Sequence, residues 1–322
     1  MTPLSGHRHL DPETLARLAG LQLRVNAVME GTLAGLHRSP HHGSSIEFAE
    51  HKEYSPGDDL RHLDWKAYGK LDRYYVKRFE NETELRAYLM LDCSGSMGYG
   101  EPLTKLEYSS ILVACLAHLL NRQGDQTGLV VFDEKVRRYV PPRASTTHLA
   151  EVLDALDKVA PSGGTDLAGA IRYLTEVIGH RTLTVLASDL FDTGGPGGFT
   201  PAGGSGPGYF RAAPKPEGHA LRLLRHLRAR RHHVVLLHVL HPDELQFPFS
   251  DLTLFESMED TAQVLVDPAG IRKRYLAEIG RFLDETRQQC LAAEIDYHLV
   301  SIAEPPHEVL LRFISAGGSA RR

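Results

Sequence analysis

The chain has 322 residues, of which 42% are hydrophobic and 24% charged, and its formal net charge is -5 at pH 7. This length predicts one or two domains with a core that needs no disulfides. The acidic balance provides no basic surface for nucleic acid and so excludes nucleic-acid partners. The three cysteines, Cys93, Cys115 and Cys290, lack zinc-site or redox spacing, which indicates a reducing compartment.

No segment has the pattern of a membrane anchor. Residues 1–24 carry histidines and charges where a secretion signal needs an apolar core, and no later stretch approaches the ~18 apolar residues of a membrane span. We therefore expect no membrane span and a cytoplasmic location.

The first 84 residues predict an accessory region. Asp11 can cap a helix that continues as one apolar stripe to Val28. Residues 46–84 then indicate short mixed strands around the polar segment Gly57 to Trp65. That segment fits a buried salt-bridge network at a domain junction better than a second functional surface, which stays open as the alternative.

From residue 85 to residue 322 apolar strands alternate with helices, which predicts an α/β domain with a sheet covered on both faces. Strands are expected at residues 87–91, 129–132, 183–187, 234–240 and 297–302, and helices within 105–120, 149–156, 167–174 and 271–286. The Gly/Pro-rich stretch 193–218 is expected to be a flexible insertion. We interpret it as inert, although its position after a strand end keeps a functional role open.

Three segments suggest one metal site. Asp92 ends the first strand, and Ser94 and Ser96 follow it, with Gly95 allowing a sharp turn between them. Thr165 lies near the start of a later helix, and Asp189 ends another strand. Ligands gather at the carboxyl ends of strands in open α/β sheets, and a hard oxygen set favours Mg²⁺ or Mn²⁺.

Two assignments within this set remain open. Thr165 precedes an acid, Asp166, and could instead be the N-cap of its helix. Asp192 competes with Asp189 for the last carboxylate position, and Asp189 is preferred because it directly follows the strand. Cys93 lies inside the loop, but we expect it to be a small buried residue because no neighbouring histidine could activate it.

The order and spacing of Asp92, Ser94, Ser96, Thr165 and Asp189 resemble the metal-ion-dependent adhesion site of von Willebrand factor A domains. The resemblance implies a Rossmann-like, mainly parallel sheet flanked by helices. It also implies a Mg²⁺ ion that the hydroxyls bind directly and the two aspartates reach through water. The open coordination position would take an acidic residue of a partner protein.

An upstream motif narrows the resemblance. The sequence resembles the bacterial domain-of-unknown-function-58 family at Glu47-Phe48, Tyr54 to Trp65, Val76 to Phe79 and Glu82. The resemblance extends from about Gly35 to at least Asp189. This resemblance implies a non-enzymatic, chaperone-like or assembly partner of a MoxR-type AAA+ ATPase. Many family members carry membrane helices ahead of this segment, and the present sequence shows none there.

The alternative function is a Mg²⁺-dependent phosphohydrolase similar to haloacid dehalogenase phosphatases, with Asp92 as the nucleophile. That chemistry requires a general acid two residues later, where this chain has Ser94. A basic residue that would hold the phosphate is not identifiable in the sequence. We therefore favour a binding module over an enzyme.

Overall fold

The computed structural model describes residues 51–53, 75–77, 85–179, 181–191, 219–259 and 263–317. The chain divides into two units, one of residues 39–84 and one of the remaining residues. In the smaller unit β1 (His51–Glu53) pairs antiparallel with β2 (Tyr75–Lys77). The predicted N-terminal helix, the Gly57 to Trp65 segment, the insertion at 193–218 and Asp192 lie outside the described residues.

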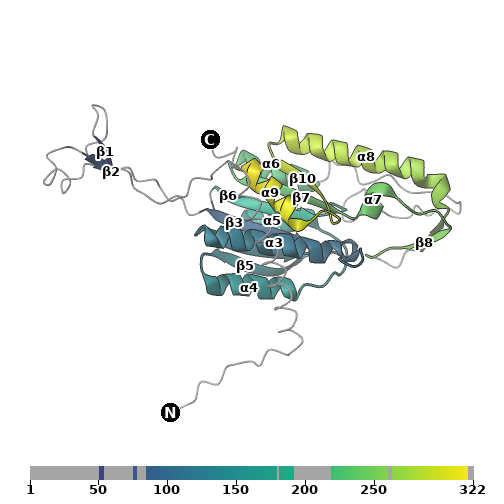
Figure 1. The fold of residues 1–322 in the computed structure, drawn as a ribbon, viewed down its shortest axis with the longest axis horizontal. Coiled ribbons are helices and arrows are strands. Elements are labelled where there is room, and N and C mark those ends of the chain that lie inside the picture. Colours follow the sequence, from purple (N-terminus) through teal and green to yellow (C-terminus); the bar gives the residue numbers. More distant parts are fainter. Residues whose placement is uncertain are drawn as a thin grey trace, which may run out of the picture. The chain divides into compact units, whose positions relative to one another are not determined.

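The larger unit contains a six-stranded sheet in the order β10-β7-β6-β3-β4-β5. Its strands are β3 (Arg86–Asp92), β4 (Gln126–Phe132), β5 (Val136–Arg143), β6 (Thr182–Ser188), β7 (His233–Leu240) and β10 (Asp296–Ser301). All neighbours pair in parallel except β5, which runs antiparallel to β4. The expected mainly parallel sheet is confirmed, and the carboxyl ends of five strands therefore point to one edge (Figure 1).

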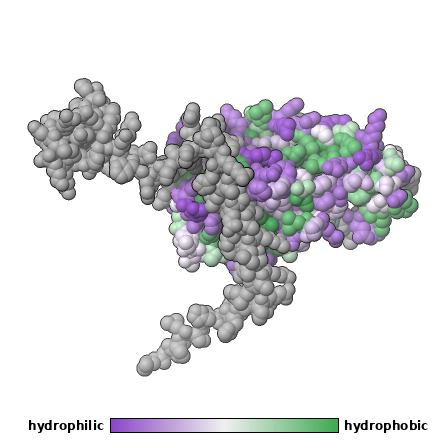
Figure 2. Space-filling view, viewed as in Figure 1, coloured by the Kyte–Doolittle hydropathy of each residue, from purple (hydrophilic) through white to green (hydrophobic). Residues whose placement is uncertain are grey.

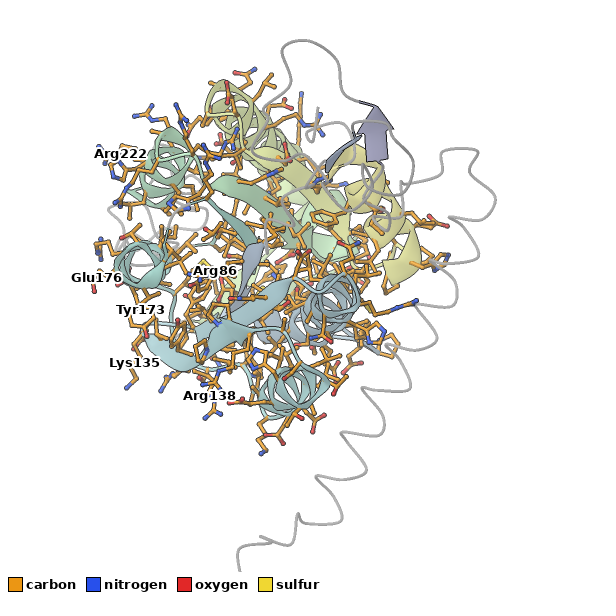
Figure 3. The ribbon with its side chains drawn as sticks, turned by 90° about the vertical axis from the view of Figure 1, so that its left-hand side faces the viewer. Arg86, Lys135, Arg138, Tyr173, Glu176 and Arg222 are labelled. Carbon is orange, nitrogen blue, oxygen red and sulfur yellow. The ribbon has the colours of Figure 1, made fainter. Side chains whose placement is uncertain are left out.

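Helices cover both faces of this sheet. One face packs against α3 (Lys105–Arg122), α4 (Thr146–Asp157) and α9 (Pro306–Gly317), and the other against α5 (Leu167–Val177), α6 (His219–Ala229) and α8 (Pro268–Ala292). Figure 3 shows the sheet between these layers, with Tyr173 of α5 and Arg222 of α6 on the same side. Leu89 and Leu91 of β3 enter one core, and Tyr88 and Met90 enter the other. This two-sided burial explains why the central strands are mostly apolar.

Helix α3 begins at a capping box. The Thr104 hydroxyl accepts a hydrogen bond from the Glu107 backbone N–H, and the Glu107 side chain accepts one from the Thr104 N–H. These bonds satisfy donors that the first turn leaves unpaired. The helix then runs through the first core with most of its residues buried, among them Lys105, whose side chain is fully buried. The sequence predicts burial of this helix, but it gives no reason to expect a buried lysine.

Several elements of the larger unit were not predicted. Strand β5, the two-stranded antiparallel hairpin of β8 (Thr253–Glu256) and β9 (Gln263–Val266), and the short helix α7 (Pro242–Gln246) have no strong apolar pattern. The reason is exposure, because β5 and the hairpin are largely open to solvent. Within the described ranges, every helix is too short or too polar to cross a lipid bilayer.

Candidate metal site at the carboxyl edge of the sheet

Asp92 is the buried centre of the candidate site. It is the last residue of β3 and is fully buried. Its Oδ1 accepts a hydrogen bond from the Ser94 backbone N–H at 3.0 Å, and its Oδ2 accepts one from the Ser188 hydroxyl at 2.6 Å. Burial, and then the charge of Asp189, raise the pKa of Asp92 to about 7. A nearby cation would stabilise the ionised form of this carboxyl group.

The hydroxyls of Ser94 and Ser96 lie beside each other. Their Oγ atoms are 3.2 Å apart, and the turn that brings them together is the 3-10 helix η2 (Gly95–Gly98). Oxygens in adjacent positions around Mg²⁺ are about 3 Å apart, since each lies about 2.1 Å from the ion. The hydroxyl pair thus has the separation that two neighbouring ligands of one magnesium ion need.

Main-chain hydrogen bonds hold the second loop against the first. The Gly95 N–H donates to the Gly163 carbonyl at 2.9 Å, and the Ser162 N–H donates to the Cys93 carbonyl at 2.9 Å. Thr165 follows in the same loop and is buried. The predicted convergence of the Asp92 loop with the Thr165 loop is therefore present in the structure.

Thr165 is not the cap of helix α5. The N-cap is Asp166, whose Oδ1 accepts a hydrogen bond from the Gly169 N–H at 2.7 Å. The N-cap interpretation of Thr165 is therefore wrong. Its hydroxyl lies 3.5 Å from Oε1 of Glu259, a residue in the segment after β8.

Asp133 positions this second loop and was missed in the sequence. It is fully buried directly after β4 and accepts hydrogen bonds from the Ser162 hydroxyl at 3.1 Å and from Nε of Arg137. Its backbone carbonyl also accepts a hydrogen bond from the Asp166 N–H at 3.0 Å. The same strand-end position that identifies Asp92 and Asp189 would have identified Asp133.

Asp189 is at the predicted edge of the sheet, but one of its carboxylate oxygens forms an ion pair with a lysine. Nζ of Lys105 lies 2.8 Å from Asp189 Oδ2 and 2.5 Å from Oε1 of Glu244, and the side chains of Lys105 and Asp189 are fully buried. Burial alone would lower the pKa of Lys105, whereas the two carboxylates raise it above its usual value. Lys105 offsets the charge of Asp189, so this carboxylate is suited to a place behind the ion rather than to direct contact.

Neither Lys105 nor Glu244 was identified from the sequence. The only signal was a lysine at the start of a helix that is otherwise apolar nearly all round. Within the described ranges, no group of three or more His, Cys, Asp or Glu residues could hold a metal ion. The hydroxyl oxygens of Ser94 and Ser96 are of the kind that suit hard ions such as Mg²⁺ and Mn²⁺.

Cys93 is unsuited to nucleophilic chemistry. Its exposed fraction is 3%, and burial, followed by the charges of Asp133 and Asp92, raises the pKa of its thiol to about 12. A thiol in this state is protonated at neutral pH and out of reach of a substrate. The prediction of a small buried cysteine is confirmed.

A mainly parallel sheet between two helical layers is the fold of a von Willebrand factor A-like domain. The model of the family described as "Protein of unknown function DUF58" matches residues 50–281, and the chain belongs to this family. The match continues well past Asp189, where the resemblance seen in the sequence weakens.

Among relatives, the uncharacterized protein Rv1480 of Mycobacterium tuberculosis is 27% identical over 265 residues, which cover 80% of this chain and 76% of the relative. The uncharacterized protein YehP of Escherichia coli is 31% identical over 121 residues, or 37% and 28% of the two chains. Among solved structures, BatB of Bacteroides thetaiotaomicron is similar at 16% identity and a TM-score of 0.41, covering 73% of this chain and 99% of BatB. The SpRpn10 VWA domain is similar at 7% identity and a TM-score of 0.36, covering 70% and 93%.

Proposed function

We propose that this chain is a non-enzymatic protein-binding module that depends on a bound Mg²⁺ or Mn²⁺ ion. The observation that carries the proposal is the Ser94–Ser96 hydroxyl pair, 3.2 Å apart, beside the buried carboxyl group of Asp92. The hydroxyls of Ser94, Ser96 and Thr165 would hold the ion directly, and Asp92 and Asp189 would hold it through water. The bound ion would offer one coordination position to an acidic side chain of a partner.

The charges around the site support binding of a further carboxylate. Lys105 offsets the negative charge of Asp189 from inside the protein. The net charge of the occupied site is therefore more positive than it would be with two uncompensated aspartates, and the site attracts an acidic group of a partner. Metal dependence and acid recognition thus follow from one arrangement.

For the partner we propose an acidic segment of a MoxR-type AAA+ ATPase, with a chaperone-like or assembly role in the cytoplasm. The basis of this choice is the resemblance of the upstream motif, residues Tyr54 to Trp65, which implies such ATPases as partners. The identity of the partner is a separate part of the proposal, and it can be wrong even if metal-dependent binding is correct.

The test is a pull-down of the full chain with the purified MoxR-type ATPase of the same genome, in Mg²⁺ and in excess EDTA. Binding should be lost in EDTA and in Asp92→Ala, and retained in Asp154→Ala, which removes an aspartate from an exposed pair on α4. Binding that is unchanged in EDTA would overturn the proposal. Release of phosphate from a generic phosphomonoester that depends on Asp92 would support the phosphohydrolase alternative instead.

A further inference from the structure

The segment that follows β8 lies directly on the candidate metal loop. A Cβ atom on Gly95 would be 2.0 Å from the carbonyl oxygen of Met258 and 3.1 Å from that of Gly163. A Cβ atom on Gly98 would be 3.3 Å from Cε of Met258. The backbone of Met258 therefore contacts the same turn that carries Ser94 and Ser96, and only glycine at position 95 permits this approach.

This contact places an acid of the chain beside a proposed metal ligand. Oε1 of Glu259 is 3.5 Å from the hydroxyl oxygen of Thr165, and Glu259 is partly buried there. Oxygens that share one Mg²⁺ ion in adjacent positions are about 3 Å apart. A shift of about half an ångström would let one ion contact both oxygens.

We propose that Glu259 is an internal ligand of the bound metal ion. Its carboxylate takes the coordination position that the proposed function assigns to a partner's acidic residue, and the inference rests on that function. The free protein is then closed by its own acid. A partner's carboxylate binds only when residues 257–259 move away, so the two acids compete for one position.

The construction of the β8–β9 hairpin allows such a movement. Phe255 of β8 stacks on Phe247 at 5.9 Å between ring centroids and meets Phe249 edge to face at 5.1 Å, which anchors one end of the hairpin. The strands of the hairpin are otherwise exposed: Leu254, which precedes Phe255, is at 51% and its cross-strand partner Leu265 at 62%. Figure 2 shows hydrophobic residues at the surface of the larger unit in the region where β8 lies in Figure 1. Displacing the segment would leave both core clusters intact.

The experiment measures Mn²⁺ affinity of the full chain by electron paramagnetic resonance of the free ion. Glu259→Gln keeps the shape of the side chain and removes the charge, and it should weaken Mn²⁺ binding by about tenfold, as loss of a metal-site partner does. The matched control is Glu256→Gln in the same hairpin, where Oε1 accepts a hydrogen bond from Gln263 Nε2 at 2.8 Å. This change should alter affinity by less than about twofold.

A second measurement adds acetate to the Mn²⁺ titration. Acetate should restore Mn²⁺ affinity to Glu259→Gln, because a carboxylate from solution can enter the vacated position, and it should leave the wild-type protein unchanged. If Glu259→Gln binds Mn²⁺ as the wild type does while Asp92→Ala loses it, the internal ligand is refuted and the metal site stands. If the wild-type protein binds no Mn²⁺, the proposed function itself is refuted.

Discussion

Replacing Lys105 with methionine would leave the carboxylates of Asp189 and Glu244 in the interior without their cation. The Asp189 and Lys105 side chains are fully buried and the ion pair is 2.8 Å long, so water cannot replace the lost partner. Removing one member of such a buried pair costs about 3–5 kcal/mol. We expect the lower end, about 3 kcal/mol, because the Glu244 side chain retains 17% exposure and can take up a proton.

The assay is urea unfolding at 25 °C, followed by circular dichroism. Burial already raises the pKa of Glu244 despite the nearby lysine. In Lys105→Met this pKa rises further, so the cost should be greatest at pH 7 and become smaller as the pH is lowered to 5 and more of the group takes up a proton. Lys158→Met is the control, since its pair with Asp154 is exposed and should change the free energy by at most about 0.5 kcal/mol. A loss below about 1 kcal/mol for Lys105→Met at pH 7 would refute the reasoning.

Two further changes test the packing around the site. Gly95→Ala places a Cβ atom against the Met258 carbonyl, so we expect the free energy of unfolding to fall by about 1–3 kcal/mol and Mn²⁺ binding to weaken. Calorimetry with and without Mn²⁺ measures both effects. An unchanged melting temperature would contradict the close approach. His238 is fully buried, and burial lowers its pKa to about 4, below the 6.5 of the unfolded chain, so its stabilising contribution is complete above pH 6.5 and declines as the pH falls towards 4. At pH 5 this decline amounts to about 2 kcal/mol, and urea midpoints for wild type and His238→Gln should converge between pH 7 and pH 5; parallel midpoints would show that His238 does not titrate in this way.

The central sheet was predictable because its strands are buried on both faces. Residues 87–91 are an uninterrupted apolar run. The runs 183–187 and 234–240 are each interrupted by one polar residue, Thr184 and His238, and all three runs lie within observed strands. Strand β5 gave no such signal, since it is at the edge of the sheet, half exposed, and includes Pro141 and Pro142. The β8–β9 hairpin was missed for the same reason, because apolar periodicity reports burial and these strands have little of it.

The site was predictable only in part. Strand ends and hydroxyl spacing located Asp92, Ser94 and Ser96, because local chain geometry decides where those side chains lie. The partners that complete the site come from far away in the chain: Lys105 is 84 residues from Asp189, and Thr165 is 94 residues from Glu259. Neither pair of residues is indicated by a periodic pattern in the sequence. Distances between such residues are a property of the folded chain, so spacing arguments cannot find them.

The prolines of β5 have a consequence for self-association. Pro141 and Pro142 stand at a register shift of the antiparallel edge strand, and neither has a backbone N–H. Successive N–H groups of a strand face opposite sides, so one of the two prolines removes a donor from the free edge, and a strand from a second copy could not form a regular ladder there. The prolines therefore disfavour growth of aggregates by edge-to-edge strand addition at β5.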